Sequence, residues 1–362
     1  MDAQNIAQRV RDLRDELSRR FVDILVLTKP ANVTYLTGFS GEDSWAVVAK
    51  GAVYLLTDSR YTEQAQKECP LARIVERKDL IAEAAGKLLG GLKATQTVGV
   101  ENAISLAQYQ ALKNNIPARL RAMDGLVENQ RSVKDDSELA AIRSAAAIAA
   151  AAFQRAVRHL RPGITESTLA GILDLEIRRQ GAKVGFETIV AFGPNASRPH
   201  HQPSQRTLGE TDTILIDFGA RYNGYCCDIT RSFALGRSTA AYRRAYAAVE
   251  KAQAAAIRVA KAGAELVEVD TAARGAIRAT GLPVYGHGTG HGFGLEIHEI
   301  PFLKEKTKGK LRAGQIITIE PGVYLPSKLG VRIEDDILIT DEGCELLTGA
   351  CPHRSPLEAD SR

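Results

Sequence analysis

Residues 215–233 read LIDFGARYNGYCCDITRSF and combine a turn signal with two aspartates. The Asn-Gly dipeptide at 223–224 predicts a two-residue hairpin loop, because both residues tolerate the positive φ that a type I′ turn requires. Such a loop places Gly219 opposite Asp228, and since side chains alternate along a strand, Asp217 and Asp228 share one face about 7–8 Å apart. Two anions that point to one place are costly without cations. The hairpin therefore predicts a cation site, unless one aspartate is simply exposed at a strand end.

Four further segments place histidines or glutamates in glycine-rich or apolar surroundings: GPNASRPHHQPS (193–204), GHGTGHGFGLEIHE (286–299), ITIEPGVY (317–324) and GVRIEDDI (330–337). Glu320 ends one apolar run and Glu334 lies inside another, where a carboxylate needs either an arginine such as Arg332 or a metal as its partner. His291 stands among alternating glycines, which allow the backbone to approach a cavity closely. A phosphate loop is the alternative interpretation of these glycines, but the G-x-G-x-x-G spacing and a following Lys-Ser/Thr are missing.

These segments supply the candidate ligands Asp217, Asp228, His291, Glu320 and Glu334. Their four carboxylates carry a charge of −4, which two divalent cations would balance in a two-metal hydrolytic site with ions about 3.5–4 Å apart. Oxygen-rich donors with one imidazole favour manganese, with cobalt, iron or zinc as alternatives. The sequence contains no H-E-x-x-H motif of a zincin, and the D-F-G at 217–219 lacks the other loops of a protein kinase.

The composition limits the class of protein. The chain has 362 residues, of which 44% are hydrophobic and 25% charged, and its 47 basic and 43 acidic residues leave a net charge of +4. This composition is typical of a soluble globular protein and does not favour binding to nucleic acid. No apolar run approaches the roughly 20 residues that span a bilayer, and the amino terminus lacks a secretory signal. Five cysteines without a C-x-x-C pair fit reduced thiols, so we expect a cytoplasmic protein.

The order of predicted elements separates two domains. Strands and helices alternate over the first third of the chain, which predicts an α/β domain with a mixed or parallel sheet. The pattern lapses into polar residues over 124–134, and we place the boundary there, with domains at 1–130 and 131–362. In the second domain, two helix-rich stretches each lead into a strand-rich stretch, which predicts an α+β fold with duplicated halves. Its predicted helices begin near 137 and cover 165–180, 239–261 and 266–279, and its predicted strands are 187–192, 213–219, 225–235, 315–320 and 331–339.

The combined motifs resemble those of the pita-bread metallopeptidases, specifically the Xaa-Pro aminopeptidases (aminopeptidase P) and the Xaa-Pro dipeptidases, or prolidases. The resemblance rests on the D-F-G…Y-x-G-Y-x-x-D-I-T-R, G-H-G-x-G-H, E-P-G-x-Y and G-x-R-I-E-D segments, which occur in this order. In the first domain, NVTYLTGF (32–39) and LLTDSRYTEQA (55–65) are similar to the creatinase-type amino-terminal domain of these enzymes. The resemblance implies an α/β creatinase-like N-terminal domain followed by an α+β pita-bread catalytic domain with pseudo-duplicated halves.

The resemblance also implies a role for each ligand. Asp217 would bind one metal ion, while Asp228 and Glu334 would bridge the two ions. His291 and Glu320 would complete the coordination of the second ion. A water molecule between the two cations would become a hydroxide near neutral pH and attack the scissile carbonyl.

Further residues receive roles from the same resemblance. Glu320 would also carry a proton to the leaving proline nitrogen. His200 and His298 would hold the substrate carbonyl and the developing oxyanion, whereas His287 would be a neighbour and not a ligand. For His201, next to His200, we expect a solvated loop position. The resemblance also places Tyr324 and Arg332 at positions that support the ligands from outside the metal coordination.

The expected activity is that of an Xaa-Pro aminopeptidase, which hydrolyses the bond between an N-terminal residue and a following proline. The nearest alternative is a prolidase, which cuts only dipeptides and needs a positive group for the product carboxylate. The glycine-rich 286–299 segment and the compact first domain favour the aminopeptidase. A small-amide hydrolase and a metal-free relative on the same scaffold are further alternatives. The resemblance implies a homodimer or larger homo-oligomer, because a neighbouring subunit often closes the pocket in this family, and we expect no nucleic-acid or membrane partner.

Overall fold

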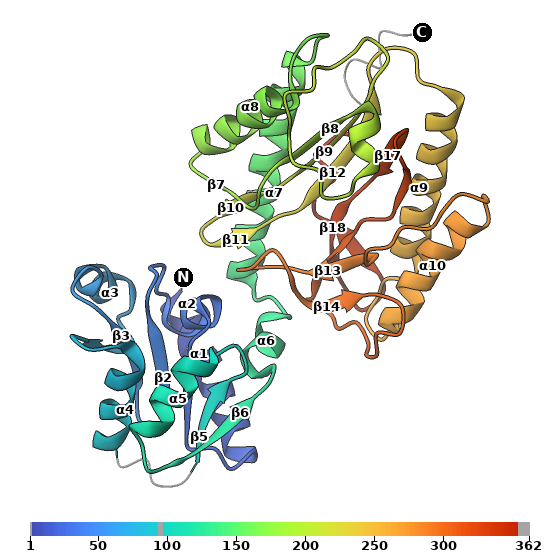
Figure 1. The fold of residues 1–362 in the computed structure, drawn as a ribbon. Helices are drawn as coiled ribbons and strands as arrows, with labels where there is room; N and C mark the ends of the chain where they lie inside the picture. The colour runs from blue at the N-terminus through green and yellow to red at the C-terminus, as the bar shows by residue number, and fades with distance from the viewer. Residues whose placement is uncertain (1, 93–96, 354–362) are drawn as a thin grey trace. The chain divides into compact units, whose positions relative to one another are not determined.

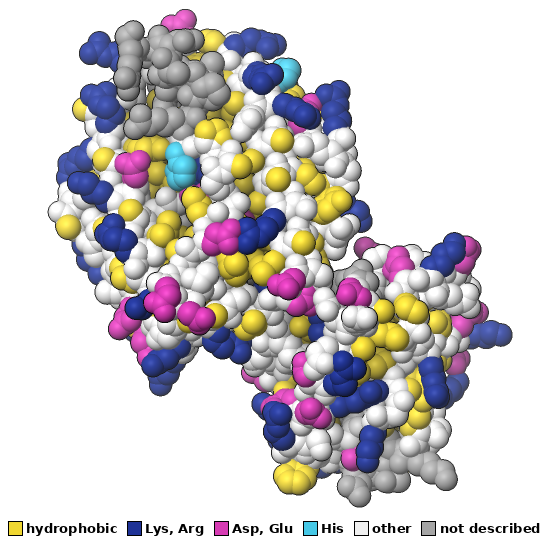
Figure 2. All heavy atoms as spheres, turned by 180° about the vertical axis from the view of Figure 1, so that it is seen from behind, with side chains coloured by type: hydrophobic (Ala, Val, Ile, Leu, Met, Phe, Trp, Pro, Cys, Tyr) yellow, Lys and Arg dark blue, Asp and Glu magenta, His cyan; other side chains and the backbone are white. Residues whose placement is uncertain are grey.

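The computed structural model describes residues 2–92 and 97–353 of the chain (Figure 1). Contacts divide the chain into two compact units, Met1–Arg131 (unit 1) and Ser132–Arg362 (unit 2), and the division falls inside the polar stretch 124–134. On the face drawn in Figure 2, basic and acidic side chains are interspersed over both units. None of the helices in the described residues combines the length and the apolar character that a membrane span requires.

The described residues of unit 1 form a six-stranded mixed sheet, as the alternation of strands and helices predicts. The strand order is β4-β3-β2-β1-β5-β6, with β2 antiparallel to both β1 and β3 and the other neighbours parallel. The strands are β1 (Ile24–Leu27), β2 (Trp45–Ala49), β3 (Val53–Thr57), β4 (Ala72–Glu76), β5 (Thr97–Glu101) and β6 (Arg119–Met123). The helices are α1 (Ala3–Arg19), α2 (Pro30–Thr37), α3 (Thr62–Glu68), α4 (Ile81–Gly91), α5 (Leu106–Asn114) and α6 (Leu126–Arg131).

Three of these elements, α2, β6 and α6, lie outside the sequence prediction. β6 is an edge strand with mostly exposed side chains, so it carries no apolar run that would mark it. α6 lies within the stretch that we expected to be polar and irregular. Its residues Leu126 and Val127 are buried, and Arg131 donates to the Oδ1 of Asn32 across 2.6 Å. Packing and this buried hydrogen bond, which are tertiary effects, stabilise a helix too short for local propensity to predict.

In the first half of unit 2, helices α7 (Asp136–Ala156) and α8 (Glu166–Arg179) precede the strands. A capping box between Asp135 and Glu138 begins α7, and Thr165 caps α8. Antiparallel strands form two three-stranded sheets, ordered β11-β10-β7 and β12-β9-β8. These strands are β7 (Lys183–Val184), β8 (Ile189–Phe192), β9 (Thr213–Phe218), β10 (Ala220–Tyr222), β11 (Tyr225–Cys226) and β12 (Ile229–Ala234), and the short helices η1 (Val157–His159) and η2 (Gly193–Ser197) lie in the connections.

The second half repeats this order, with α9 (Ala240–Val259) and α10 (Leu266–Arg278) followed by strands. A five-stranded sheet has the order β14-β13-β15-β18-β19, and β16 pairs with β17. These strands are β13 (Gly290–Gly292), β14 (Glu299–Leu303), β15 (Ile316–Ile319), β16 (Gly322–Leu325), β17 (Leu329–Arg332), β18 (Asp335–Ile339) and β19 (Cys344–Leu346). In Figure 1, α8 lies on one side of the unit 2 strands, and α9 and α10 lie on the other.

Each half of unit 2 has its own apolar core. Helices α7 and α8 bury an alanine-rich face against β8, β9 and β12, and Phe153 of α7 stacks on Phe218 with ring centroids 5.2 Å apart. Helices α9 and α10 cover β15, β17 and β18 in the same way. The predicted α+β fold with duplicated halves is confirmed. The strands that carry the acidic residues lie between the two helix pairs.

The hairpin predicted from 223–224 forms with the predicted register. Tyr222 pairs with Tyr225, and the two loop residues have φ angles of 49° and 89°. β9 and β12 keep this register, with Thr230 facing Asp217. The turn therefore sets the relation of the two aspartates over the length of both strands.

Candidate metal centre

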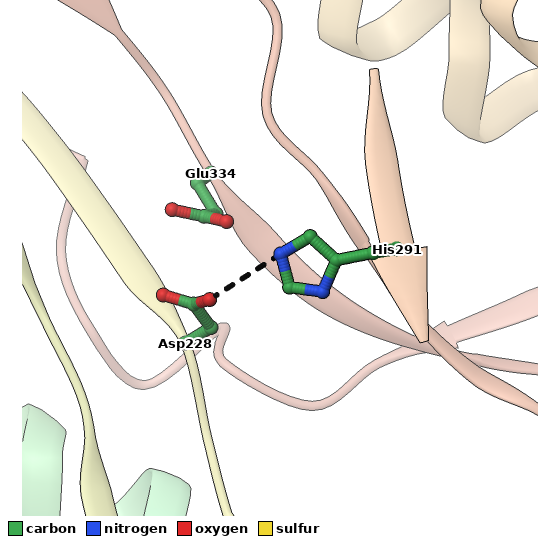
Figure 3. Close-up of side chains that lie close together, drawn as sticks. All are labelled: Asp228, His291 and Glu334. Atoms are coloured by element: carbon green, nitrogen blue, oxygen red, sulfur yellow. Dashed lines mark ion pairs between the residues drawn. The ribbon is translucent and has the colours of Figure 1, made fainter. Parts of the chain in front are cut away.

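Three buried side chains from separate segments converge in unit 2 (Figure 3). Asp228 lies between β11 and β12, His291 lies in β13, and Glu334 lies between β17 and β18. One ligand atom from each lies within 4.8 Å of the others. Figure 3 shows the imidazole pointing toward both carboxylates. The three residues could hold a metal ion between them.

Backbone pairing of the two halves brings Glu334 to this place. Its backbone N–H donates to the carbonyl oxygen of Thr230 across 3.1 Å, which links the β17–β18 connection to β12. The Thr230 hydroxyl donates to Oε2 of Glu334 across 2.5 Å and accepts from Nε of Arg332 across 3.0 Å. The orientation of Glu334 is therefore fixed by groups from both halves.

The tautomer and the neutral charge of the His291 imidazole suit a metal ligand. Its Nδ1 lies 3.0 Å from the carbonyl oxygen of Gly292, so Nδ1 carries the proton and Nε2 keeps its lone pair. Nε2 lies 3.7 Å from Oδ2 of Asp228 and 3.5 Å from Oε1 of Glu320. Burial lowers the pKa of His291 to about 4, so the ring is neutral at physiological pH.

Asp217 lies at the same site but is held differently. Its Oδ2 accepts from Nη2 of Arg332 across 2.5 Å. Its Oδ1 is buried and has no hydrogen-bond partner in the described part of the chain. The arginine that the sequence offered as an alternative partner for Glu334 forms its ion pair with Asp217 instead.

The charges of the site fit divalent cations. Burial, together with repulsion from neighbouring carboxylates, raises the pKa of Asp228 and Glu334 well above their usual values. Burial also raises the pKa of Glu320 to about 8. Buried carboxylates this close together repel one another, and either protons or divalent cations relieve that repulsion. The unpartnered oxygen of Asp217 and the neutral imidazole of His291 are further donors of the kind that a metal requires.

A pocket of about 400 Å³ gathers every predicted site residue, namely His200, Asp217, Asp228, His291, His298, Glu320 and Glu334. The rings of His298 and His291 lie 4.5 Å apart. Apolar side chains line the same pocket, among them Phe186, Ile189 and Phe302. The catalytic roles implied by the resemblance remain predictions, but the residues that they require lie together.

His287 lies in the pocket with both ring nitrogens engaged. Nδ1 lies 2.7 Å from the carbonyl oxygen of Gly288, and Nε2 lies 2.9 Å from the hydroxyl of Tyr324. Because Nδ1 must donate to the carbonyl, Nε2 accepts from Tyr324, whose oxygen accepts in turn from Arg332 across 2.9 Å. These bonds agree with His287 being a neighbour of the ligands, and they place Tyr324 and Arg332 in one network with Asp217.

The solvated position expected for His201 is wrong. This side chain is buried, and its Nε2 lies 2.8 Å from Oε2 of Glu166. Consecutive histidines in a loop can face opposite sides, and here His200 takes the pocket side. Glu166, at the start of α8, has no local feature in the sequence that would predict this contact.

Sequence reasoning also missed three residues near the site. Asp336 is buried, and its Oδ2 accepts from the backbone N–H of Asp228 across 3.0 Å. Its position in the acidic run Glu334–Asp336, which begins at a predicted ligand, is the sequence feature that could have predicted it. Phe302 and Lys304 line the pocket, and Nζ of Lys304 lies 4.7 Å from the centroid of the Phe302 ring.

A neutral imidazole and several carboxylates around one pocket, set between paired α+β halves, define a metal-dependent hydrolase. The comparison with known families narrows this class. Residues 140–341 match metallopeptidase family M24, and residues 9–133 match the creatinase/prolidase N-terminal domain. The chain belongs to metallopeptidase family M24, and it has the expected creatinase-like and pita-bread domains.

Named relatives cover nearly the whole chain. An Xaa-Pro dipeptidase of Pyrococcus furiosus is 33% identical over 347 residues, which are 94% of this chain and 97% of that protein. The structure of an Xaa-Pro dipeptidase from Bacillus anthracis superposes with a TM-score of 0.91 at 36% identity and covers 95% of this chain and 98% of that one. The structure of an X-Pro aminopeptidase from Thermotoga maritima has a TM-score of 0.89 at 33% identity, with the same coverage of both chains. The chain is therefore similar to metallopeptidases that act at proline.

Proposed function

We propose that this metallopeptidase is an Xaa-Pro dipeptidase, which hydrolyses the bond between an N-terminal residue and a C-terminal proline. The observation that carries the proposal is the similarity to named Xaa-Pro dipeptidases over more than nine-tenths of both chains. This similarity supports the dipeptidase better than the aminopeptidase that the sequence patterns favoured. Proline peptides need a dedicated enzyme, because the imide nitrogen has no N–H and the ring fixes φ.

One basic side chain supports a dipeptide as substrate. A dipeptide places its carboxylate next to the scissile bond, so the pocket needs a cation for it. Arg332 is already bound to Asp217. Lys304 lines the pocket and forms no ion pair within the described part of the chain. We infer that Lys304 receives the carboxylate, while Phe302 beside it offers an apolar surface to the proline ring.

Each residue of the site would then have a separate role in hydrolysis. Divalent cations, when bound to the candidate ligands, supply the positive charge that polarises a carbonyl and lowers the pKa of water. Glu320, whose pKa is raised to about 8 by burial, can hold a proton and deliver it to the proline nitrogen as the C–N bond breaks. His200 and His298 line the pocket where they can donate to the carbonyl oxygen as it gains charge.

A second candidate is an Xaa-Pro aminopeptidase, which the similarity to the Thermotoga maritima structure favours. The two differ in the longest substrate that they accept. We therefore suggest assaying purified protein with added Mn²⁺ on Xaa-Pro, Xaa-Pro-Xaa and longer peptides. Cleavage confined to dipeptides supports the dipeptidase. Equal or faster cleavage of the longer peptides would overturn it and identify the aminopeptidase.

Manganese as the native metal is also a proposal, supported by the oxygen-rich donors and single imidazole of the site. Activity of the metal-stripped protein with Mn²⁺, Co²⁺, Zn²⁺ and Fe²⁺ tests it. A homodimer or larger homo-oligomer stays a prediction, which light scattering after gel filtration would test. The cytoplasmic location stays a prediction as well.

A further inference from the structure

Glu166 and His201 form a buried pair that the proposed catalytic steps do not use. Nε2 of His201 lies 2.8 Å from Oε2 of Glu166, and the two side chains are 6% and 0% exposed. We propose that this pair is a positioning device that holds the 193–204 loop so that His200 points into the pocket. The inference rests on the proposed function of that pocket.

The carboxylate of Glu166 binds both ends of the loop. Oε1 accepts from the backbone N–H of Phe192 across 2.7 Å and from Nδ2 of Asn195 across 2.9 Å. Oε2 accepts from His201 and from both the backbone N–H and the hydroxyl of Ser204, at 3.0 and 2.5 Å. Burial by itself would raise the pKa of Glu166, but these donors outweigh it and lower the pKa. One buried anion, placed at the N-terminus of α8, therefore fixes the start, middle and end of the loop.

His201 is adjacent to His200 in the chain, so fixing His201 also restricts the position of His200 at the pocket. His201 enters the interior, whereas His200 lines the pocket with Pro199 and Gln202. On the pocket side, the carbonyl oxygen of Pro199 accepts from Arg332 across 3.3 Å. The short backbone around His200 is thus held from both sides. Within the described residues, Glu166 bonds to none of the five candidate metal ligands, so its effect should reach catalysis through His200.

The donor pattern makes Glu166→Gln an informative variant. Both carboxylate oxygens accept from N–H or O–H groups, and a glutamine offers one oxygen and one NH₂. In one orientation the NH₂ group faces the backbone N–H of Phe192, and in the other it faces the backbone N–H of Ser204, so either orientation breaks at least one hydrogen bond to the loop backbone. The size of the side chain is kept, so the core is not opened. The matched control is Glu176→Gln on the same helix, because Glu176 pairs with Arg155 and Arg179 and does not contact the loop.

We expect Glu166→Gln to lower kcat about tenfold to a hundredfold, because a shift of about 1 Å in a group that contacts the substrate can cost about a hundredfold in rate. Metal content by plasma mass spectrometry should be unchanged, and Glu176→Gln should match the wild-type protein in both measurements. His201→Gln keeps an N–H donor and should retain more activity than His201→Leu. This pair of variants tests the idea even if Glu166→Gln fails to fold.

A double-mutant cycle with His200→Ala separates positioning from general stabilisation. If Glu166 acts through His200, adding Glu166→Gln to His200→Ala should lower kcat by less than about threefold. An equal loss in both backgrounds, or a loss shared by Glu176→Gln, would overturn the proposal.

Hydrogen exchange of the 193–204 backbone gives a readout that does not depend on the substrate. Faster exchange in Glu166→Gln than in Glu176→Gln is expected, and unchanged exchange contradicts the anchoring. If the wild-type protein fails to cleave Xaa-Pro dipeptides, the proposed function fails, while this exchange result still decides the anchoring.

Discussion

Arg332 donates through Nη2 to Oδ2 of Asp217 across 2.5 Å, and both side chains are largely buried. This ion pair neutralises one oxygen of Asp217 and leaves Oδ1 without a hydrogen-bond partner among the described residues. Arg332 also donates to Thr230, which donates to Glu334. A single guanidinium therefore orients two of the predicted metal ligands.

Arg332→Gln should lower both metal affinity and kcat/KM by roughly tenfold to a hundredfold, because it releases Asp217 and Thr230 together. It should also destabilise the metal-free protein by roughly 3–5 kcal/mol, as expected when one partner of a buried ion pair is removed. Metal titration calorimetry, steady-state kinetics and urea unfolding measure these effects. Arg332→Lys keeps the charge but loses the planar donor fork. Its metal affinity, kcat/KM and stability should therefore lie between those of Arg332→Gln and those of the wild-type protein. A lysine variant equal to wild type contradicts the proposed role.

Asp228→Ala and Glu334→Ala should each abolish metal binding and turnover, because each removes an acid of the buried three-residue cluster. Metal content after dialysis and peptide hydrolysis measure the two effects. Asp341→Ala, which changes an exposed aspartate, is the matched control and should behave like the wild-type protein. Full activity in either cluster variant would refute the assignment of that residue as a ligand.

His298→Ala should lower kcat by roughly a hundredfold to a thousandfold while metal content stays near the wild-type value. His298 lies beside His291 in the pocket but is predicted to contact the substrate and not the metal. Parallel kinetics and metal analysis separate these roles. Equal loss of metal and activity would make His298 a ligand.

The metal-free protein should lose stability as pH rises, and metal binding should tighten over the same range. Burial raises the pKa of Glu320 from its ordinary 4.5 to about 8, and the pKa values of Asp228 and Glu334 are raised as well. The folded state therefore binds these protons more tightly than the unfolded chain, and their contribution to stability falls as pH rises through the folded pKa. Cations must displace the same protons, so binding is weaker at low pH.

Calorimetric unfolding at several pH values, with and without Mn²⁺, tests this linkage. The stabilisation by Mn²⁺ should grow between about pH 6 and pH 8.5, and titration in two buffers should reveal proton release. Glu320→Gln removes one titrating group and should flatten both trends. A metal affinity independent of pH is the contrary result.

Lys304→Gln should raise KM for Xaa-Pro dipeptides about fivefold to tenfold with little change in kcat, because it removes the cation inferred to meet the carboxylate. The same variant should leave KM for a C-terminally amidated dipeptide unchanged. Lys308→Gln, on the same loop but outside the pocket lining, is the control. Equal effects on the acid and the amide argue against a contact with the carboxylate.

Local signals predicted much of the fold and the ligand types. The Asn-Gly loop at 223–224 set the register that brings Thr230 opposite Asp217. Capping residues and apolar periodicity predicted the helices of unit 2 to within a few residues. In unit 1 the sequence did not predict helix α2, edge strand β6 or helix α6, because packing against neighbouring elements stabilises them and their own residues carry no clear periodic pattern.

The sequence by itself determined which side chains could bind cations. A carboxylate in an apolar run is costly unless a cation compensates it, and a histidine among glycines can lie close to a cavity. Only the tertiary structure decided which residue pairs with which side chain. It paired Arg332 with Asp217 and buried His201 against Glu166. The physical reason is that such contacts join residues from distant segments, and which donor reaches which acceptor depends on how the two halves pack, about which short-range periodicity carries no information.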